Sequence, residues 1–254
     1  MAPPIRRYAR VETPSGARWA EKVDAGFVLL DAAPFEGGKP EGKVLADAVL
    51  LPASPASKVV CVGQNYRKHA QEMGKPVPVE PLLFLKPSTA LNAHRQPIRL
   101  PPASNEVHHE SELALVIGKR LSQVDEAGAR AGIWAHSCFN DVTARDIQKR
   151  EVQHTRAKSY DTFACLGPYC VTGIDDADLR VVARVNGEVR QDGRTSDMIF
   201  PPAKLVSFIS QVMTLLPGDV IATGTPSGVG PLKDGDVVEI EIEHVGVLQN
   251  PVKK

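Results

Sequence analysis

The chain has 254 residues, of which 43% are hydrophobic and 24% are charged, as is ordinary for a soluble globular protein. Lysine and arginine together number 30, as do aspartate and glutamate, so the formal net charge is zero. This balance excludes the single-sign excess expected of a protein that binds nucleic acid or an acidic membrane surface. A chain of this length can bury a large core in one β-rich domain, or in one domain with a small appendage.

No stretch of the sequence is apolar for long enough to cross a membrane. The first residues, MAPPIRRYARVETP, contain arginines but lack the apolar core of a secretory signal. Cys61, Cys138, Cys165 and Cys170 are scattered and form no CxxC pair, so we expect them to be reduced and buried. These features predict a cytoplasmic enzyme. The near-zero net charge offers little protection against self-association and favours an oligomer.

The first 55 residues have a different character from the rest. Short strand-like segments at residues 5–11, 18–23 and 27–30 alternate with Gly and Pro breaks such as PSG and EGGKPEG. The stretch LPASPASK, residues 51–58, is typical of a linker. We therefore predict a small β-rich N-terminal domain over residues 1–55 and a main domain over residues 56–254.

The main domain consists mostly of short predicted strands, at residues 59–63, 81–87, 181–185, 188–190, 219–223 and 236–243. Asn186 and Gly187 join two of them and are typical of a type I′ hairpin turn. Helices are predicted at residues 66–73, 125–136 and 205–215, and the Pro-rich residues 74–81 form a loop able to act as a lid. Because helices and strands do not alternate regularly, the pattern favours a mostly β fold over a doubly wound sheet.

The segment HHESELALVIGK, residues 108–119, carries the clearest chemical signal. Glu110 and Glu112 lie two residues apart, and such residues project from the same face of a strand. Two carboxylates held that close repel each other and raise each other's pKa unless a cation lies between them. A hard divalent metal bound by oxygen is the simplest such cation. The alternative is a solvated strand edge, which the apolar run LALVI disfavours.

A site with two carboxylates is incomplete, so a third acid should come from another element. Asp141, in CFNDVTARDIQ, is the best candidate. Asp146 is better explained as a partner for Arg145 or Lys149. Three oxygen ligands and water suit Mg²⁺ or Mn²⁺.

Two further groups could carry out proton transfer and charge stabilisation. His69 and Glu72 lie three apart and would be neighbours on a helix, where a carboxylate on one imidazole nitrogen makes the other a better base. The alternative is a surface histidine with an ordinary charge partner. Lys158, in RAKSYDTF, could stabilise an oxyanion, although most lysines are simply solvated.

Two other motifs border this chemistry. The loop TGTPSGVG, residues 223–230, has glycines that could bring backbone N–H groups close to a small anion, or it is only a tight connection. It lacks the GK[ST] of a nucleotide-binding loop. His108 and His109 belong to no HExxH motif, so we expect them to support the metal ligands rather than to bind the metal.

Together these motifs resemble the fumarylacetoacetate hydrolase family, in its short bacterial form. The resemblance covers nearly all of residues 59–230, and its motifs occur in the family's order: GQNYRKHAQEM, PLLFLKPSTA, HHESELALVIGK, NDVTARDIQ, AKSYDTF, NGEVRQDGRTSDMIF and TGTPSGVG. It implies an α+β fold that is mostly β, a mixed β-sandwich roll, usually as a homodimer. The segment before residue 56 resembles the small β domain of many bacterial members but matches no motif.

The resemblance also implies roles for particular residues. It implies Mg²⁺, with Mn²⁺ as an alternative, bound by Glu110, Glu112 and Asp141. The catalytic residues implied are His69 and Glu72 as a base dyad on a mobile lid and Lys158 at the oxyanion; the substrate contacts implied are Arg145, Gln148 and Thr225.

The function implied is cleavage of a C–C bond in an acylpyruvate, a small 2-oxo acid, by a metal-dependent hydrolase that releases pyruvate. Because the same enolate forms in related reactions, an isomerase or decarboxylase of aromatic catabolism, acting on 2-hydroxydienoic or 2-oxo diacids, is the alternative. A non-catalytic binding module would be expected to lack the acids or the dyad, and both are present.

Overall fold

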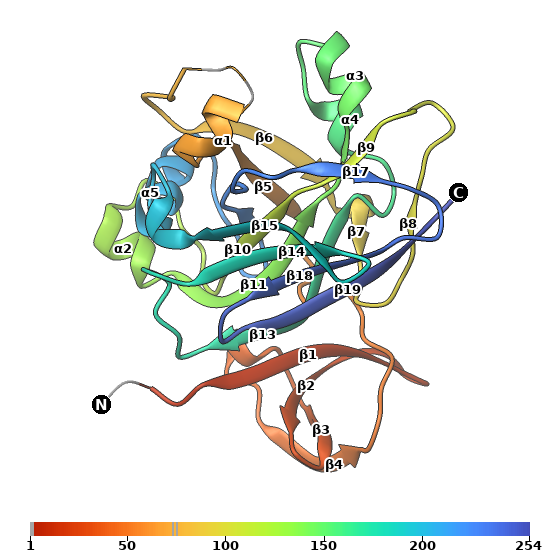
Figure 1. The fold of residues 1–254 in the computed structure, drawn as a ribbon. Helices are drawn as coiled ribbons and strands as arrows, with labels where there is room; N and C mark the ends of the chain where they lie inside the picture. Colours follow the sequence, from red (N-terminus) through yellow and green to blue (C-terminus); the bar gives the residue numbers. More distant parts are fainter. Residues whose placement is uncertain (1–2, 73, 75) are drawn as a thin grey trace.

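The computed structural model describes residues 3–72, 74 and 76–254, and these form a large mixed sheet covered on one face by a smaller sheet (Figure 1). The large sheet has the strand order β4-β3-β2-β1-β13-β11-β10-β16-β5-β6, with β7 paired to β13. Its strands are β1 (Arg6–Thr13), β2 (Gly16–Val23), β3 (Gly26–Leu30), β4 (Pro40–Leu45), β5 (Lys58–Gly63), β6 (Leu82–Pro87), β7 (Leu91–Asn92), β10 (Ser111–Ile117), β11 (Ile133–Asp141), β13 (Ala164–Thr172) and β16 (Val220–Ala222).

The second sheet packs against β10, β11 and β13 of the first. Its order is β15 (Glu188–Arg194), β14 (Arg180–Val185), β18 (Val237–Ile242), β19 (Gly246–Lys253) and β8 (Ile98–Arg99). A small third sheet joins β12 (Thr143–Ala144), β9 (Val107–His109) and β17 (Gly230–Leu232). The helices are α1 (Arg67–Glu72), α2 (Glu126–Arg130), α3 (Arg145–Arg150), α4 (Thr155–Lys158) and α5 (Pro202–Val212), with 3-10 turns at Pro34–Glu36, Ser88–Ala90 and Thr195–Asp197.

Strand β10 lies at the centre of the core, and all seven of its residues are buried. Leu113 and Leu115 belong to the apolar cluster that lies between the two sheets, together with Val181 and Ile240. Ala114, one residue on, belongs to the cluster on the opposite face of the large sheet. Successive residues of a strand point to opposite faces, so burial on both faces explains why this strand is almost continuously apolar.

The N-terminal strands β1–β4 project below the main body as an antiparallel meander (Figure 1). They are not a separate sheet, because β1 pairs with β13 through registers such as Tyr8 with Cys170. Residues 51–57 have no regular structure, yet Ala53 and Ser54 are buried, and Ser54 donates a hydrogen bond to the Gly218 carbonyl at 2.5 Å. The domain boundary placed at residue 55 stays a prediction.

Most predicted elements are confirmed to within a few residues. The predicted hairpin forms, with left-handed φ values of 53° at Asn186 and 81° at Gly187, as a type I′ turn requires. Helix α1 begins at Arg67, and Met73, the last residue of that predicted helix, lies outside the described residues. Helix α5 begins and ends three residues earlier than predicted.

The helix predicted over residues 125–136 is wrong beyond Arg130. Helix α2 is a short turn that begins after Asp125, whose carboxylate accepts a hydrogen bond from the Gly128 N–H. From Ile133 onward the chain is strand β11, which pairs with β10 on one side and β13 on the other. Tertiary pairing in the centre of a sheet overrides the local helical pattern.

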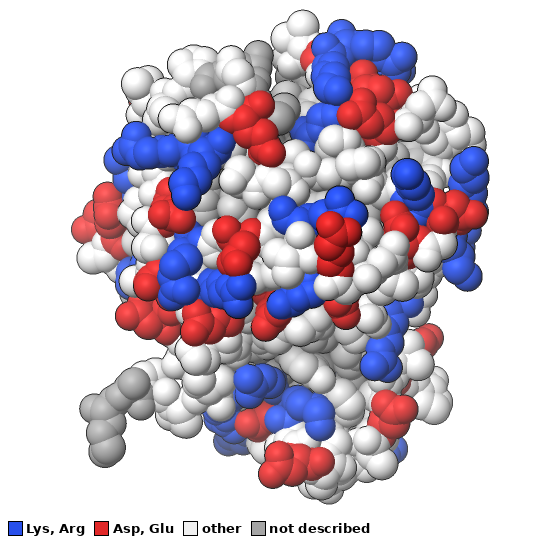
Figure 2. All heavy atoms as spheres, viewed as in Figure 1, with Lys and Arg blue, Asp and Glu red and all other residues white. Residues whose placement is uncertain are grey.

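The remaining global features agree with the composition. All four cysteines are free and buried, as predicted. No helix in the described part of the chain is long and apolar enough to cross a membrane. Figure 2 shows lysine and arginine interspersed with aspartate and glutamate over one face, as the equal numbers of acids and bases would lead one to expect.

Candidate active site

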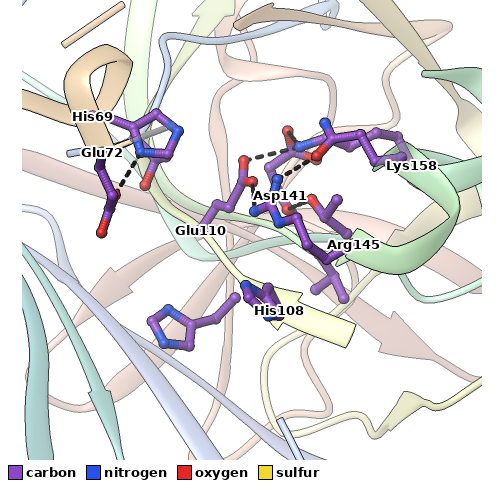
Figure 3. A network of polar contacts seen from close by, with 12 residues as sticks. His69, Glu72, His108, Glu110, Asp141, Arg145 and Lys158 are labelled. Carbon is purple, nitrogen blue, oxygen red and sulfur yellow. Dashed lines mark hydrogen bonds and ion pairs between the residues drawn. The ribbon is translucent and has the colours of Figure 1, made fainter. Parts of the chain in front are cut away.

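Three buried acids meet at one end of the large sheet, between α1 and the α3–α4 segment (Figure 3). Glu112 is the second residue of β10, and Asp141 is the last residue of β11. Glu110 lies in the break between β9 and β10, where its carbonyl accepts a hydrogen bond from the Asp141 N–H at 3.0 Å. The carboxylates of Glu110, Glu112 and Asp141 each offer an oxygen within 4.8 Å of the others. The antiparallel register of β10 and β11 therefore brings the third acid to the first two.

Two of these acids are held by cations. Lys158 places its Nζ 2.9 Å from an oxygen of Glu110 and 2.6 Å from an oxygen of Asp141. Arg145 is ion-paired with the other oxygen of Glu110. Burial alone would raise the pKa of Glu110, but Lys158 and Arg145 hold that pKa well below its usual range. Burial lowers the pKa of Lys158, and the two acids outweigh it, so that this pKa is raised.

Glu112 has the opposite character. It accepts a hydrogen bond from the Gly224 N–H at 2.8 Å, but no ion pair joins it to a cation among the described residues. Burial, and then the negative charges of Asp141 and Glu110, raise the pKa of Glu112 well above its ordinary value. A divalent cation among the three acids would remove this cost, and carboxylate oxygens are the ligands that hard cations prefer. The residues present therefore fit a divalent metal.

A histidine with a carboxylate partner faces the acids from α1 (Figure 3). The Glu72 carboxylate accepts a hydrogen bond from Nδ1 of His69 at 3.0 Å and a second one from the Gly228 N–H at 3.0 Å. This arrangement fixes the proton on Nδ1 and leaves Nε2 as the basic nitrogen. His69 is only 5% exposed. The spacing recognised in the sequence therefore forms the dyad expected of a general base.

These groups line one cavity of about 510 Å³. Of the nine residues singled out in the sequence, Glu72 acts behind His69, and eight line the cavity: His69, Glu110, Glu112, Asp141, Arg145, Gln148, Lys158 and Thr225. Arg145 donates to the side-chain oxygen of Gln148, so these two are ordered together. A cavity with a metal-ligating corner, a base and several donors can bind a small anion and move a proton on it.

Three residues of the site were missed in the sequence. Lys86, on β6, is fully buried, forms an ion pair with Asp141 and donates to the Val142 carbonyl at 3.1 Å. Its position inside the apolar run PLLFLKP was a usable signal, because an unpaired lysine is almost never buried. His154 lines the cavity and packs edge-on against Phe84 with ring centroids 5.5 Å apart. Gln191, on β15, contacts the loop that carries Thr225, and no local pattern marked it.

Two interpretations of neighbouring residues need correction. Asp146 accepts hydrogen bonds from Ser104 Oγ at 2.6 Å and from the Asn105 N–H at 3.2 Å, and it forms no ion pair with Arg145 or Lys149. It therefore anchors the segment before β9 to α3.

The two histidines beside the glutamates have other partners. His108 contacts Glu106 at 3.0 Å, and His109 contacts Gln191 at 3.1 Å. Neither is hydrogen-bonded to one of the three acids. Burial lowers the pKa of His109 to about 4, so it is neutral near pH 7.

This chain is similar to known proteins over most of its length. The model for the fumarylacetoacetate (FAA) hydrolase C-terminal domain matches residues 58–253. A human mitochondrial oxaloacetate tautomerase is 44% identical over 215 residues, which cover 80% of this chain and 68% of that protein. The structure of a 2-hydroxyhepta-2,4-diene-1,7-dioate isomerase from Mycobacterium marinum is 45% identical and superposes with a TM-score of 0.90, covering 98% of each chain.

A fumarylpyruvate hydrolase from Pseudomonas aeruginosa, solved with Mn²⁺ and pyruvate, is 31% identical with a TM-score of 0.75, covering 79% of this chain and 91% of that one. These likenesses confirm the mostly β fold with mixed sheets. With a family match over most of its length and relatives above 40% identity, the chain belongs to the fumarylacetoacetate hydrolase family.

Proposed function

We propose that this chain is a metal-dependent hydrolase that cleaves the C3–C4 bond of an acylpyruvate and releases pyruvate. The observation that carries the proposal is the position of the His69–Glu72 dyad, which shares one cavity with the three acids. A base close to a carboxylate cluster can generate hydroxide, or move a proton, next to a chelated 2-oxo acid.

Glu110, Glu112 and Asp141 would hold the metal, and we propose Mg²⁺, with Mn²⁺ as a substitute. The bound cation would supply Lewis-acid stabilisation of the negative charge that develops on the 2-oxo oxygen. Three buried cations, Lys86, Arg145 and Lys158, equal the three carboxylates in number, although none of them pairs with Glu112. Occupation by a divalent ion would therefore leave the cavity positive, which favours an anionic substrate.

The chain's own residues account for the steps of hydrolysis. His69 takes a proton from water through Nε2, while Glu72 stabilises the imidazolium that results. The hydroxide adds to the C4 carbonyl, whose oxyanion accepts a hydrogen bond from Lys158. An ammonium has three donors, and two of those on Lys158 are used by Glu110 and Asp141.

The C4 oxyanion then re-forms its carbonyl, so that the C3–C4 bond breaks and the acyl fragment leaves as a carboxylic acid. The electron pair of the broken bond forms the pyruvate enolate, and the proton held by His69 returns to C3. We propose that Arg145, Gln148 and Thr225 contact the substrate during these steps, since all three line the cavity.

A second candidate is an isomerase or tautomerase of 2-oxo or 2-hydroxydienoic acids. The tautomerase and the isomerase described above are 44% and 45% identical to this chain, whereas the fumarylpyruvate hydrolase is 31% identical. In this reaction His69 would move a proton to or from C3 of the substrate without attack by water. Loss of CO₂ from a 2-oxo diacid would pass through the same enolate.

The test is an ultraviolet and product assay with acetylpyruvate, fumarylpyruvate and oxaloacetate, each with Mg²⁺ and with EDTA. Mg²⁺-dependent release of pyruvate from the acylpyruvates supports the hydrolase. Keto–enol interconversion of oxaloacetate without pyruvate from the acylpyruvates would favour the second candidate. If no substrate reacts and no metal binds, both are wrong.

We also propose a cytoplasmic homodimer, because the net charge of zero does not oppose self-association. Light scattering after gel filtration measures its mass directly. A monomer at micromolar concentration would contradict this part of the proposal.

A further inference from the structure

Gln191 is buried on β15, outside the cavity, and its side-chain amide is fully used. Its Oε1 accepts from the Ser111 N–H at 2.9 Å and from His109 Nδ1 at 3.1 Å. Its Nε2 donates to Thr225 Oγ1 at 2.7 Å and to the Pro226 carbonyl at 2.8 Å. One side chain thus ties the start of β10 to the loop over residues 223–230.

The backbone of β15 is also pressed against this loop. A Cβ on Gly228, where φ is +99°, would lie 2.1 Å from the Arg190 carbonyl oxygen. A Cβ on Gly193 would lie 2.6 Å from the Pro226 side chain. Only glycine permits both approaches without a shift of the backbone. Strand β15 therefore acts as the surface on which the loop is held.

The direction of the Gln191 amide is determined by its neighbours. The Ser111 N–H can only donate and the Pro226 carbonyl can only accept, so oxygen must face the first and nitrogen the second. Thr225 Oγ1 consequently accepts a hydrogen bond from Gln191. Its own O–H proton is left to donate, and no described residue accepts it. Because Thr225 lines the cavity, this donor is available to a bound ligand.

We propose that Gln191 is a positioning residue that holds the Thr225 hydroxyl as a hydrogen-bond donor to the carboxylate of the substrate. The inference rests on the proposed function, in which Thr225 meets a 2-oxo acid. It extends that function by making recognition of the carboxylate depend on a residue that never touches the substrate.

The test is the binding of pyruvate to Gln191→Glu. This change keeps the shape of the side chain and keeps an oxygen that faces Ser111 and His109. The second carboxylate oxygen would face Thr225. The Thr225 hydroxyl would then donate its proton to this oxygen, so the proton would no longer point towards the ligand. We expect the Kd of pyruvate, measured by titration calorimetry with Mn²⁺ present, to rise about tenfold, as for loss of one hydrogen bond to a charged group. The Kd of methyl pyruvate, which has no carboxylate, should stay within about twofold. Gln191→Met, which has no donor to Thr225, is the second variant if Gln191→Glu does not fold. It should likewise raise the Kd of pyruvate and leave the Kd of methyl pyruvate within about twofold.

A double-mutant cycle separates positioning from a merely structural role. Thr225→Val should raise the Kd of pyruvate as much as Gln191→Glu does, and the double variant should be no worse than Thr225→Val alone. The matched control is Asp192→Asn, the next residue of β15, which is exposed and paired with Arg180; it should leave the Kd unchanged.

The outcomes keep the two ideas distinct. If wild type binds pyruvate and Gln191→Glu binds it equally well, or if its effect persists in full beside Thr225→Val, the role of Gln191 is refuted while the proposed function stands. An equal rise in the Kd of pyruvate and of methyl pyruvate in Gln191→Glu also refutes the role of Gln191. If wild type with Mn²⁺ binds neither ligand, the proposed function is wrong and the inference is wrong with it.

Discussion

Replacement of Glu112 by Gln provides the sharpest test of the metal site. Glu112 is buried without an ion pair, and burial together with Asp141 and Glu110 raises its pKa well above the ordinary value. The amide can still accept the hydrogen bond from Gly224, so the fold should be kept. In the presence of EDTA near pH 8 we expect the variant to be at least as stable as wild type, because the change removes a repelled carboxylate.

Mg²⁺ should reverse this order of stability, because it should stabilise wild type more than Glu112→Gln. At a free Mg²⁺ concentration of about 100 Kd, binding stabilises wild type by about 2.7 kcal/mol, which corresponds to a rise in Tm of about 5–11 °C for a chain of this size. If loss of one ligand weakens binding about a hundredfold, the same Mg²⁺ adds only about 0.4 kcal/mol, or about 1 °C.

The assay is thermal denaturation with EDTA and with Mg²⁺, and Glu106→Gln, at a partly exposed acid nearby, is the control. A Glu112→Gln variant that keeps the wild-type Mg²⁺ shift would refute the assignment of the three acids. A variant whose Tm in EDTA drops by several degrees would refute the argument from repulsion.

Three further predictions follow from the site and its surroundings. His69→Ala should lower kcat by about 10²–10⁴-fold while Mg²⁺ affinity stays within about twofold, and an unchanged kcat would rule out this base. Lys86→Met should lower the free energy of unfolding in EDTA by about 3–5 kcal/mol, because Asp141 loses a buried partner; a loss below about 1 kcal/mol in urea denaturation would contradict this. His94 accepts the Gln249 N–H through Nδ1, and burial lowers its pKa from 6.5 to about 4. As the pH falls, the His94 imidazole is therefore protonated in the unfolded chain before it is protonated in the folded protein. Stability should be lost as the pH falls from about 6.5 towards 4, and the Tm of His94→Asn should fall less steeply over this range.

Local patterns predicted the parts of the site that lie close together in the sequence. The interval between Glu110 and Glu112, and the apolar run after them, indicated a metal site next to a buried strand. The interval between His69 and Glu72 indicated a dyad, and the structure forms that contact. Both predictions depended only on the repeats of strand and helix, which local backbone geometry determines.

Local patterns were insufficient where long-range pairing decides the conformation. Residues 133–136 read as the end of a helix but form the start of β11, because they lie between β10 and β13. Likewise β1 extends the large sheet through β13, although its sequence resembles that of a separate unit.

The sequence by itself determined which residues could supply the proposed chemistry: a cluster of carboxylates, a histidine with a carboxylate partner, and a mostly β chain able to bury them. The tertiary structure alone decided how that chemistry is supported. Lys86 reaches Asp141 from β6, and Gln191 reaches Thr225 from β15, across 55 and 34 positions of the chain. No periodic pattern or short spacing in the sequence marks such contacts. They form only when the sheets pack, because a buried polar group then needs a hydrogen-bond or ion-pair partner from another element.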